Sequence, residues 1–283
     1  MSHATPQLIK ELRERTGAPL GKCKEALEHS QGKVELSIEY LRKTGIASAV
    51  KKESRTTKEG SILAYETKEA VALVEMNAET DFVVNNEKFA AFQQEVVKEA
   101  CESKVDSLEA LLAKKCKGDS SKTIDEGRKE LISVLGENIN ISRVLVVLKK
   151  PNTSIGVYSH MKGKILCLVE IAGGSGEEAL AKEVAMHIAA EAPDYLKPEE
   201  VPLEVQEKEA EIARSAVASN KPAEVINKIV EGKVKAFYDQ VCLLQQKFVK
   251  DNTMTVGNFV AERGKAVNKP LQVVRFIRWR VGA

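Results

Sequence analysis

The sequence has few of the residues that build metal sites, disulfide frameworks or histidine-based active sites. It contains four histidines and five cysteines among 283 residues. None of them forms a C-x-x-C pair or a cluster with the spacing of zinc ligands. An odd number of scattered cysteines is typical of reduced thiols. We therefore expect no metal site and no disulfide bonds.

Catalytic motifs and long apolar runs are also missing. There is no G-x-x-x-x-G-K-[ST], no G-x-S-x-G and no H-E-x-x-H motif. No apolar run approaches the roughly 20 residues of a membrane span, and the N-terminus has a helical pattern in place of a signal sequence. We expect a cytoplasmic protein that is not an enzyme, binds no cofactor and does not contact membranes.

The charges are nearly balanced. Lys and Arg total 43 and Asp and Glu total 41, which gives a net charge of +2. A protein that neutralises nucleic-acid phosphates is normally clearly basic, so the balance disfavours direct nucleic-acid binding. The hydrophobic fraction of 43% is large enough for one large or two to three small domains.

The first part of the chain predicts a bundle of three short helices over residues 1–50. Thr5-Pro6 is typical of an N-cap followed by proline at the first helical position, and Gly17 is typical of a stop. The third helix is expected to end near Gly45. A polar, basic linker is expected over residues 51–59.

A pattern of two β-rich runs followed by a helix then occurs twice. The first copy reads GSILAYETKEAVALVEMN and later KFAAFQQEVVKEAC, and the second reads GVYSHMKGKILCLVEIA and later EEALAKEVAMHIAAEA. Each pair of runs predicts an antiparallel hairpin, and Val74-Glu75 in the first matches Val169-Glu170 in the second. We expect two related α+β subdomains, each with helices on one face of a small antiparallel sheet.

The remaining segments extend these subdomains. Charged helical stretches over 205–219 and 223–241 predict a projecting helical hairpin. In the closing FIRWRV, apolar residues alternate with Arg278 and Arg280, which predicts a strand with one buried face that completes the second sheet. The expected core boundaries are 60–151 for the first subdomain, 152–198 with 242–283 for the second, and 199–241 for the inserted hairpin.

The two copies differ where the hairpin meets the helix. The second has a compact glycine turn, Gly173–Gly176, and the first has the longer segment NAETDFVVNNE. The glycine turn formally matches a dinucleotide-binding fingerprint. Because that fingerprint needs a parallel βαβ unit, we interpret it as a tight turn into a capped helix. We call this connection between hairpin and helix the joint. The same unit is used twice and only the first copy has an enlarged joint, so the enlarged joint is a candidate functional site.

The enlarged joint contains the candidate site, Thr80-Asp81-Phe82-Val83. One interpretation is a helix N-cap with Phe82 turned into the core. The other is an exposed loop, because a better helix start lies near Asn86. An exposed phenylalanine beside a carboxylate can anchor a partner protein, with about 1.5–3 kcal/mol from a fully buried ring. We favour the exposed loop.

Two histidines are candidate bases. His187 lies in an alanine-rich helix, where a packed and hydrogen-bonded histidine is expected. His160 lies on the turn of the second hairpin, where it is either an exposed residue without a function or a contact to a partner.

Several segments together resemble the elongation factor Ts family, in order and over nearly the whole chain. EMNAETDFVVNN (residues 75–86) closely resembles the exchange loop of that family and is the most specific segment. LRERTGAPLGKCKEAL (residues 12–27) is similar to its N-terminal segment, and GENINISRV, AMHIAA and FIRWRVG follow. Some members continue into a C-terminal helix that touches the partner, and we expect that contact to be absent here.

The resemblance implies a nucleotide-exchange factor for the GTPase elongation factor Tu. It implies that the Thr80–Val83 segment enters the nucleotide-binding domain of that partner. There Asp81 and Phe82 would disturb the elements that hold Mg²⁺ and reshape the phosphate loop, as part of translation elongation. It also implies outer contacts through Arg13, Leu20 and His160, and it is compatible with a homodimer or a two-to-two complex.

The expected fold class is α+β. It comprises an N-terminal three-helix, UBA-like bundle, two related subdomains with small antiparallel sheets, and an inserted helical hairpin or coiled coil.

Two other functions remain as alternatives. An RNA-binding accessory protein of translation would use Lys51–Lys58 and the basic end at Arg275, Arg278 and Arg280. The lack of aromatic residues among the first group and the strand alternation of the second speak against it. A nucleotide-binding enzyme would be built on the glycine turn.

Overall fold

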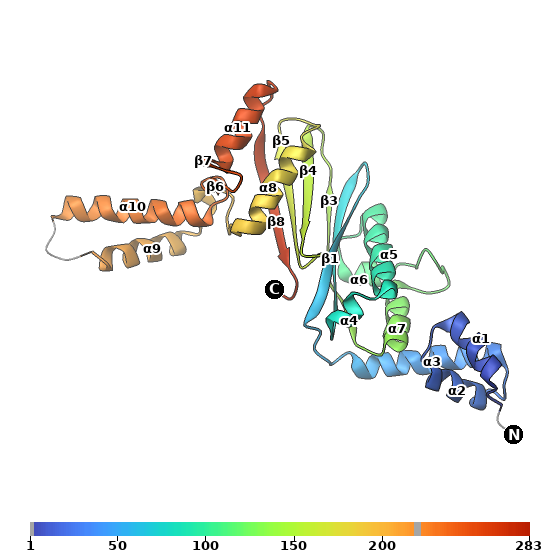
Figure 1. The fold of residues 1–283 in the computed structure, drawn as a ribbon. Coiled ribbons are helices and arrows are strands. Elements are labelled where there is room, and N and C mark those ends of the chain that lie inside the picture. The colour runs from blue at the N-terminus through green and yellow to red at the C-terminus, as the bar shows by residue number, and fades with distance from the viewer. Residues whose placement is uncertain (1–2, 218–221) are drawn as a thin grey trace. The chain divides into compact units, whose positions relative to one another are not determined.

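The structure is a computed structural model that describes residues 3–217 and 222–283 (Figure 1). These residues form an α+β fold with N-terminal helices and small antiparallel sheets. Its contacts divide the chain into two units. The first comprises Met1–Leu148, Lys162–Lys164 and Arg280–Ala283, and the second comprises Lys149–Met161 and Ile165–Trp279.

Three helices begin the first unit: α1 (Pro6–Thr16), α2 (Leu20–His29) and α3 (Val34–Lys52). Thr5 caps α1, as predicted, by accepting a backbone N–H at 3.3 Å, and Gly17 ends it with a φ of 66°. The three helices bury a small apolar core between them. That core consists of Ala4, Leu12, Ala18, Cys23, Ala26 and Leu27.

The prediction that the third helix ends near Gly45 is wrong, because α3 continues to Lys52. Gly45 is buried, and a Cβ atom at this position would lie 2.7 Å from the Oγ of Ser133 on α7 (Ile124–Leu135). Glycine therefore allows two helices to approach closely here, and it does not stop α3.

The first sheet has the order β1-β2-β3, with β1 (Glu59–Glu66), β2 (Ala70–Ala78) and β3 (Ile139–Leu148). Both pairings are antiparallel, which confirms the predicted hairpin. Every residue of β2 is buried. The helices α5 (Glu87–Ser103) and α6 (Leu108–Leu112) pack with α7 beside this sheet (Figure 1).

The second sheet has the order β4-β5-β8, with β4 (Thr153–His160), β5 (Ile165–Ala172) and β8 (Gln272–Arg280). The closing strand completes this sheet as predicted. Its FIRW residues 276–279 are all half-buried, so the expected division into a buried and a solvated face is wrong for them. The helix α8 (Glu178–Glu191) packs against β4 and β5.

The glycine turn lies between β5 and α8 and follows an antiparallel hairpin. The parallel unit that a dinucleotide site requires is not formed there. The interpretation of this segment as a tight turn into a helix is confirmed, but the expected cap is wrong, because the side chain of the N-cap residue Glu177 makes no cap hydrogen bond.

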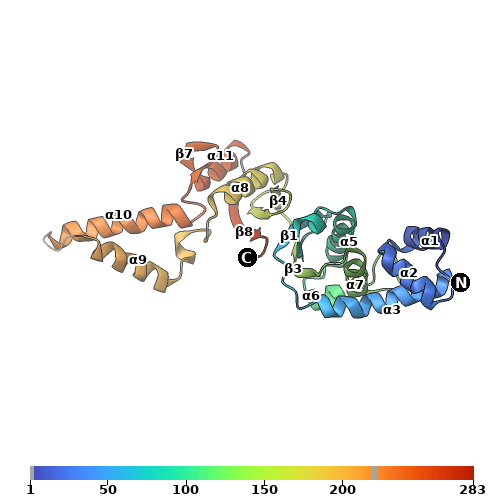
Figure 2. The same ribbon diagram turned by 60° about the horizontal axis from the view of Figure 1, so that its bottom comes forward.

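The second unit also carries a helix pair, α9 (Leu203–Ser215) and α10 (Ala223–Val241), which lie side by side in both views (Figures 1 and 2). The predicted stretch over 205–219 ends beyond residue 217, outside the described residues. The hydroxyl of Tyr238 donates a hydrogen bond to Gln206 across the pair at 2.7 Å.

A short two-stranded sheet that the sequence did not predict follows the pair, with β6 (Lys247–Phe248) and β7 (Asp251–Thr255). It leads into α11 (Val256–Ala266), and the 3₁₀ turn η1 (Pro198–Glu200) precedes the pair. Within residues 3–217 and 222–283, no helix is both long and apolar enough to cross a membrane.

Candidate functional site at the joint between β2 and α5

The enlarged joint contains one turn of helix, α4 (Asp81–Val84), where the sequence predicted an irregular loop. The backbone N–H of Asn85 closes this turn on the carbonyl of Asp81 at 2.9 Å. The long helix begins where it was expected, because the side chain of Asn86 caps α5 by accepting the N–H of Lys88 at 2.9 Å.

Two neighbouring residues of α4 face opposite ways. The side chain of Phe82 is 84% exposed, whereas Val83 is 8% exposed and belongs to the core of the first unit. The expectation that Phe82 lies outside the core is confirmed, but the expectation of four exposed residues is wrong. One helical turn rotates successive side chains by about 100°, so one residue can anchor the turn while the next projects.

The acidic residue of the site is exposed. No described residue gives the Asp81 carboxylate a hydrogen bond or an ion pair. A carboxylate without an internal partner is available to pair with a cation outside the chain.

Thr80 stands at the N-cap position of α4 but does not cap it. Its backbone is extended, and no side-chain cap hydrogen bond forms. Its hydroxyl donates to Glu137 at 2.8 Å, and its backbone N–H donates to the other oxygen of the same carboxylate at 3.0 Å. The turn therefore lacks a cap worth about 1 kcal/mol, and a contact to a distant residue takes its place.

A second hydrogen bond joins the same two segments, but here the residue after β2 is the acceptor and the residue before β3 is the donor. The Glu79 carboxylate accepts the backbone N–H of Asn138 at 2.7 Å. We call Glu79, Thr80, Glu137 and Asn138 the β2–β3 latch, because they join the end of β2 to the residues just before β3. Sequence reasoning missed the latch. Its only signal was the GEN at the start of GENINISRV.

The latch also reaches the end of α3. The Asn138 side-chain amide donates to the carbonyl of Arg55 at 2.8 Å and to that of Glu53 at 3.3 Å. Arg55 in turn lies 3.4 Å from the Glu79 carboxylate. The joint is thus held from three sides, by its apolar anchor, by the latch and by the segment after α3.

Comparison with known proteins identifies the family of this chain. Residues 79–283, which begin at the latch, match the family model described as "Elongation factor TS". The chain belongs to the elongation factor Ts family. It is 51% identical to elongation factor Ts of Protochlamydia amoebophila over 282 residues, with both chains fully covered. It is 44% identical to that of Chlamydia muridarum and 41% identical to that of Chlamydia felis over 283 residues, again with full coverage.

Elongation factor Ts is the nucleotide-exchange factor for elongation factor Tu in translation elongation, so this member of the family is an exchange factor and not an enzyme. No group of three potential metal ligands occurs within residues 3–217 and 222–283.

The other predicted contact residues lie on separate elements of this elongation factor Ts chain. Arg13 is exposed on α1, and Leu20, the first residue of α2, is 55% exposed. His160 is exposed at the end of β4 in the second unit, where its Nδ1 lies 3.3 Å from the hydroxyl of Tyr158.

His187 is the packed, hydrogen-bonded histidine that the sequence predicted. It is fully buried in α8, with Nε2 at 2.9 Å from Gln246 Oε1. The backbone N–H of Val249 donates to its Nδ1 at 3.2 Å, so Nδ1 is unprotonated and Nε2 carries the proton. Burial lowers the pKa of this imidazole.

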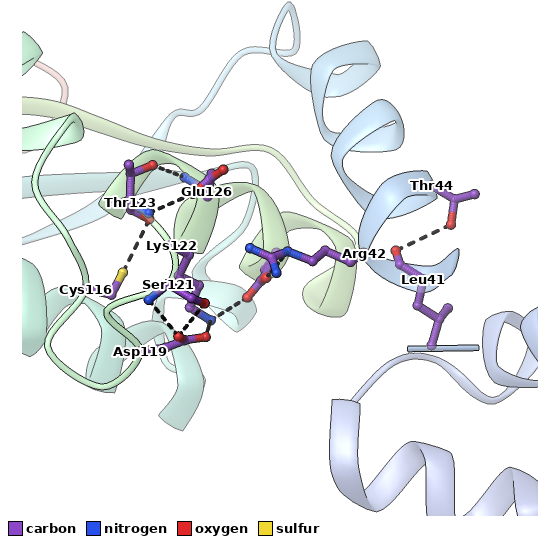
Figure 3. A network of polar contacts seen from close by, with 10 residues as sticks. Leu41, Arg42, Thr44, Cys116, Asp119, Ser121, Lys122, Thr123 and Glu126 are labelled. Atoms are coloured by element: carbon purple, nitrogen blue, oxygen red, sulfur yellow. Dashed lines mark hydrogen bonds and ion pairs between the residues drawn. The ribbon is translucent and has the colours of Figure 1, made fainter. Parts of the chain in front are cut away.

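A cavity of about 400 Å³ lies beside α3 and α7 in the first unit of this family member. Figure 3 shows Arg42 on α3 and Lys122 on the loop before α7 within its polar network. Both cations pair with Glu130, at 3.6 Å and 2.5 Å, and Arg15 pairs with Glu35 at 2.7 Å. Glu130 on α7 pairs with Arg42 on α3, and Arg15 on α1 pairs with Glu35 on α3, so we assign these ion pairs to holding α3 against its neighbours.

Proposed function

We propose that this chain accelerates GDP release from elongation factor Tu by inserting Asp81 and Phe82 of α4 into its nucleotide-binding domain. The observation that carries this proposal is the contrast within one turn, since Phe82 is 84% exposed while Val83 anchors the turn in the core. An aromatic ring held out by a rigid support loses little conformational freedom on binding, and such residues carry much of the energy of interfaces.

The unpaired Asp81 carboxylate gives the insertion its electrostatic effect. A GTPase retains GDP partly because Mg²⁺ neutralises charge on the phosphates. A carboxylate placed near that site attracts the cation or its ligands and repels the phosphates, so it weakens the binding of GDP. The ring of Phe82 would hold the rearranged site open.

Exchange then follows from the coupling of two binding events. By linkage, the chain weakens GDP binding by the same factor by which GDP weakens binding of the chain. Free nucleotide in excess can therefore displace the chain and complete the cycle.

The other parts of the chain have supporting roles in this proposal. Arg13 and Leu20 on the UBA-like bundle of residues 1–50 contact the same partner domain, and His160 contacts another domain. The chain acts in the cytoplasm without direct contact to nucleic acid, either alone or as a homodimer or two-to-two complex. The proposed divisions are the linker 51–59, core subdomains 60–151 and 152–198 with 242–283, and an inserted coiled-coil hairpin over 199–241.

A repeated ion pair supports the relationship between the two core subdomains. Glu75 on the central strand β2 pairs with Arg143 on β3 at 2.6 Å. Glu170 on the central strand β5 pairs with Arg275 on β8 at 2.8 Å. Both glutamates follow a valine and are almost fully buried, so the same device stabilises each sheet.

The proposed insertion is tested by the Phe82→Ala variant. We expect factor-stimulated release of a fluorescent GDP analogue, measured by stopped flow, to slow by about tenfold or more, the size of one lost anchor. Asp81→Asn should weaken the dependence of the stimulated rate on Mg²⁺ concentration. Wild-type rates from Phe82→Ala would refute the insertion.

Several of the basic residues that the RNA-binding alternative needs are engaged within the chain, although Lys51, Lys58 and Arg280 are exposed. Arg55 and Arg275 are engaged with Glu79 and Glu170. Lys52 is half-buried, and burial lowers its pKa. A surface that binds phosphates needs exposed cations that are not already paired.

A further inference from the structure

We propose that Glu137 is a positioning residue for nucleotide exchange, which holds Thr80 and thereby fixes the direction in which α4 presents Asp81 and Phe82. This inference rests on the proposed function of α4. Glu137 belongs to the β2–β3 latch and not to α4, so it acts on the turn through its two hydrogen bonds with Thr80.

The first step is that α4 cannot orient itself. It has four residues, and isolated helices need roughly 12–15 residues before they are even marginally stable in water. Its N-cap residue makes no cap hydrogen bond. The orientation of this turn must therefore come from contacts with the rest of the unit.

The second step is that the apolar anchor alone does not define the orientation. Val83 and the half-buried Val84 are neighbours at the C-terminal end of the turn and pack on the same core, and a turn held at one end can still rotate about that end. The two hydrogen bonds of Glu137 hold the backbone and the side chain of Thr80, three residues earlier. Two separate points of attachment define a direction for Phe82, which lies between them.

The third step is the strength and origin of this attachment. Both acceptor oxygens belong to one carboxylate, at 2.8 Å and 3.0 Å from their donors, and hydrogen bonds to a charged acceptor are stronger than neutral ones. Glu137 directly follows Gly136, which ends α7 in the left-handed region with a φ of 84°. The carboxylate thus extends from the rigid end of a helix.

The consequence is preorganisation. With the latch intact, the ring of Phe82 meets the partner in one direction. Without it, the turn samples several directions, and the complex must order it at a cost in binding and in rate.

The test compares Glu137→Ala, Thr80→Val, Thr80→Ser and the double variant Glu137→Ala/Thr80→Val. The stimulated GDP release rate is measured over a range of factor concentrations, so that the maximal rate and the half-saturating concentration are obtained separately. We expect Glu137→Ala to lower the maximal rate roughly tenfold. Thr80→Val should share part of this loss, and Thr80→Ser, which keeps the hydroxyl, should lose less than Thr80→Val.

The double variant should be no slower than Glu137→Ala alone, because both substitutions remove the same contact. The matched control is Glu87→Ala, which removes an exposed carboxylate from the first turn of α5 and should leave the maximal rate unchanged. Hydrogen exchange at the Thr80 amide should speed up in Glu137→Ala, because that amide loses its acceptor.

A purely structural role would lower the melting temperature and the folded fraction, with the maximal rate per folded molecule unchanged. That result would overturn the inference, and so would a double variant whose losses multiply. If Glu137→Ala does not fold, Glu137→Gln serves as the test, since it keeps the shape of the side chain. Phe82→Ala in the same assay separates the two proposals. Normal exchange by Phe82→Ala refutes the insertion, whereas slow exchange by Phe82→Ala with normal exchange by Glu137→Ala refutes only the positioning role.

Discussion

The two core sheets differ in how their central strand is connected to the helix that follows it. In the second, the turn between β5 and α8 is closed, because a Cβ atom at Gly173 would lie 2.1 Å from the carbonyl oxygen of Pro270. The Ser154 hydroxyl donates to the carbonyl of Gly174 at 3.0 Å and accepts the N–H of Glu177 at 2.9 Å. In the first, the connection opens outward and places Phe82 in solvent.

This difference shows what a joint needs in order to carry a partner contact. The closed turn is held by the Ser154 hydroxyl and by the Lys269 ammonium, which donates to the carbonyl of Ser175 at 2.8 Å, and its glycines present no side chains. The open joint presents side chains, and it needs Val83 and the latch to hold it. Exposure of a binding residue is therefore combined with tertiary support for the residues next to it.

The largest expected effect comes from filling the closed turn. Gly173 has a φ of 95°, and its Cβ position overlaps backbone, so Gly173→Ala should lower the free energy of unfolding by about 3 kcal/mol or more. Gly176 has a φ of 84° but no atom within 4 Å of the Cβ position. Gly176→Ala should therefore cost only about 1–2 kcal/mol of backbone strain. Urea unfolding measures both, and equal losses would contradict the closed packing.

The next effect separates the two neighbours in the open joint. Val83→Ala removes buried methyl groups and should lower the free energy of unfolding by about 1–3 kcal/mol. Phe82→Ala removes an exposed ring and should change it by no more than about 0.5 kcal/mol. Thermal unfolding of the two variants measures this contrast. A large loss of stability in Phe82→Ala would show that the ring packs against the protein.

A smaller effect tests the shared ion pair of the two sheets. Arg275→Met leaves Glu170 buried without its cation, which should destabilise the protein at neutral pH. We expect a loss of only about 2 kcal/mol, because Arg275 is partly exposed and solvent screens the pair. Arg143→Met should cost less. Glu75 keeps hydrogen bonds from Asn77 and the backbone N–H of Gly282, both at 3.0 Å. Denaturant unfolding of both variants decides the order, and a larger loss from Arg143→Met would break the comparison.

The smallest effect is a pH dependence of the second unit. Burial lowers the pKa of His187, so the folded state binds fewer protons there than the unfolded state does. This contribution to stability is present above the unfolded pKa of about 6.5 and is lost as the pH falls through the folded value. We expect the wild type to lose more stability than His187→Gln as the pH falls from 7 to 5. Identical pH profiles of the free energy of unfolding would contradict this.

Local signals predicted most of the elements. The Thr5 cap, both hairpins and the start of α5 at Asn86 follow from residues within a few positions of one another. Gly45 misled the prediction because a glycine inside a helix and a glycine after one look alike until Ser133 is known to lie beside it. The exposure of Phe82 followed from its place before a better helix start.

The support of the site could not be predicted in the same way. Glu137 contacts Thr80 across 57 positions in the sequence, and no local pattern specifies such a pair. The turn of α4 likewise depends on the burial of Val83, which is a property of the folded core and not of four residues.

The length of α3 has a consequence for how this protein can vary. The helix has 19 residues and leads from the N-terminal bundle to the segment that the latch holds. One residue more or less would move the bundle by about 1.5 Å along the helix and also turn it by about 100°. A whole number of turns would restore the rotation but would still shift the bundle by about 5.4 Å for each turn. A partner domain that contacts both α2 and α4 therefore requires a constant length of α3, and insertions and deletions in this helix should be selected against.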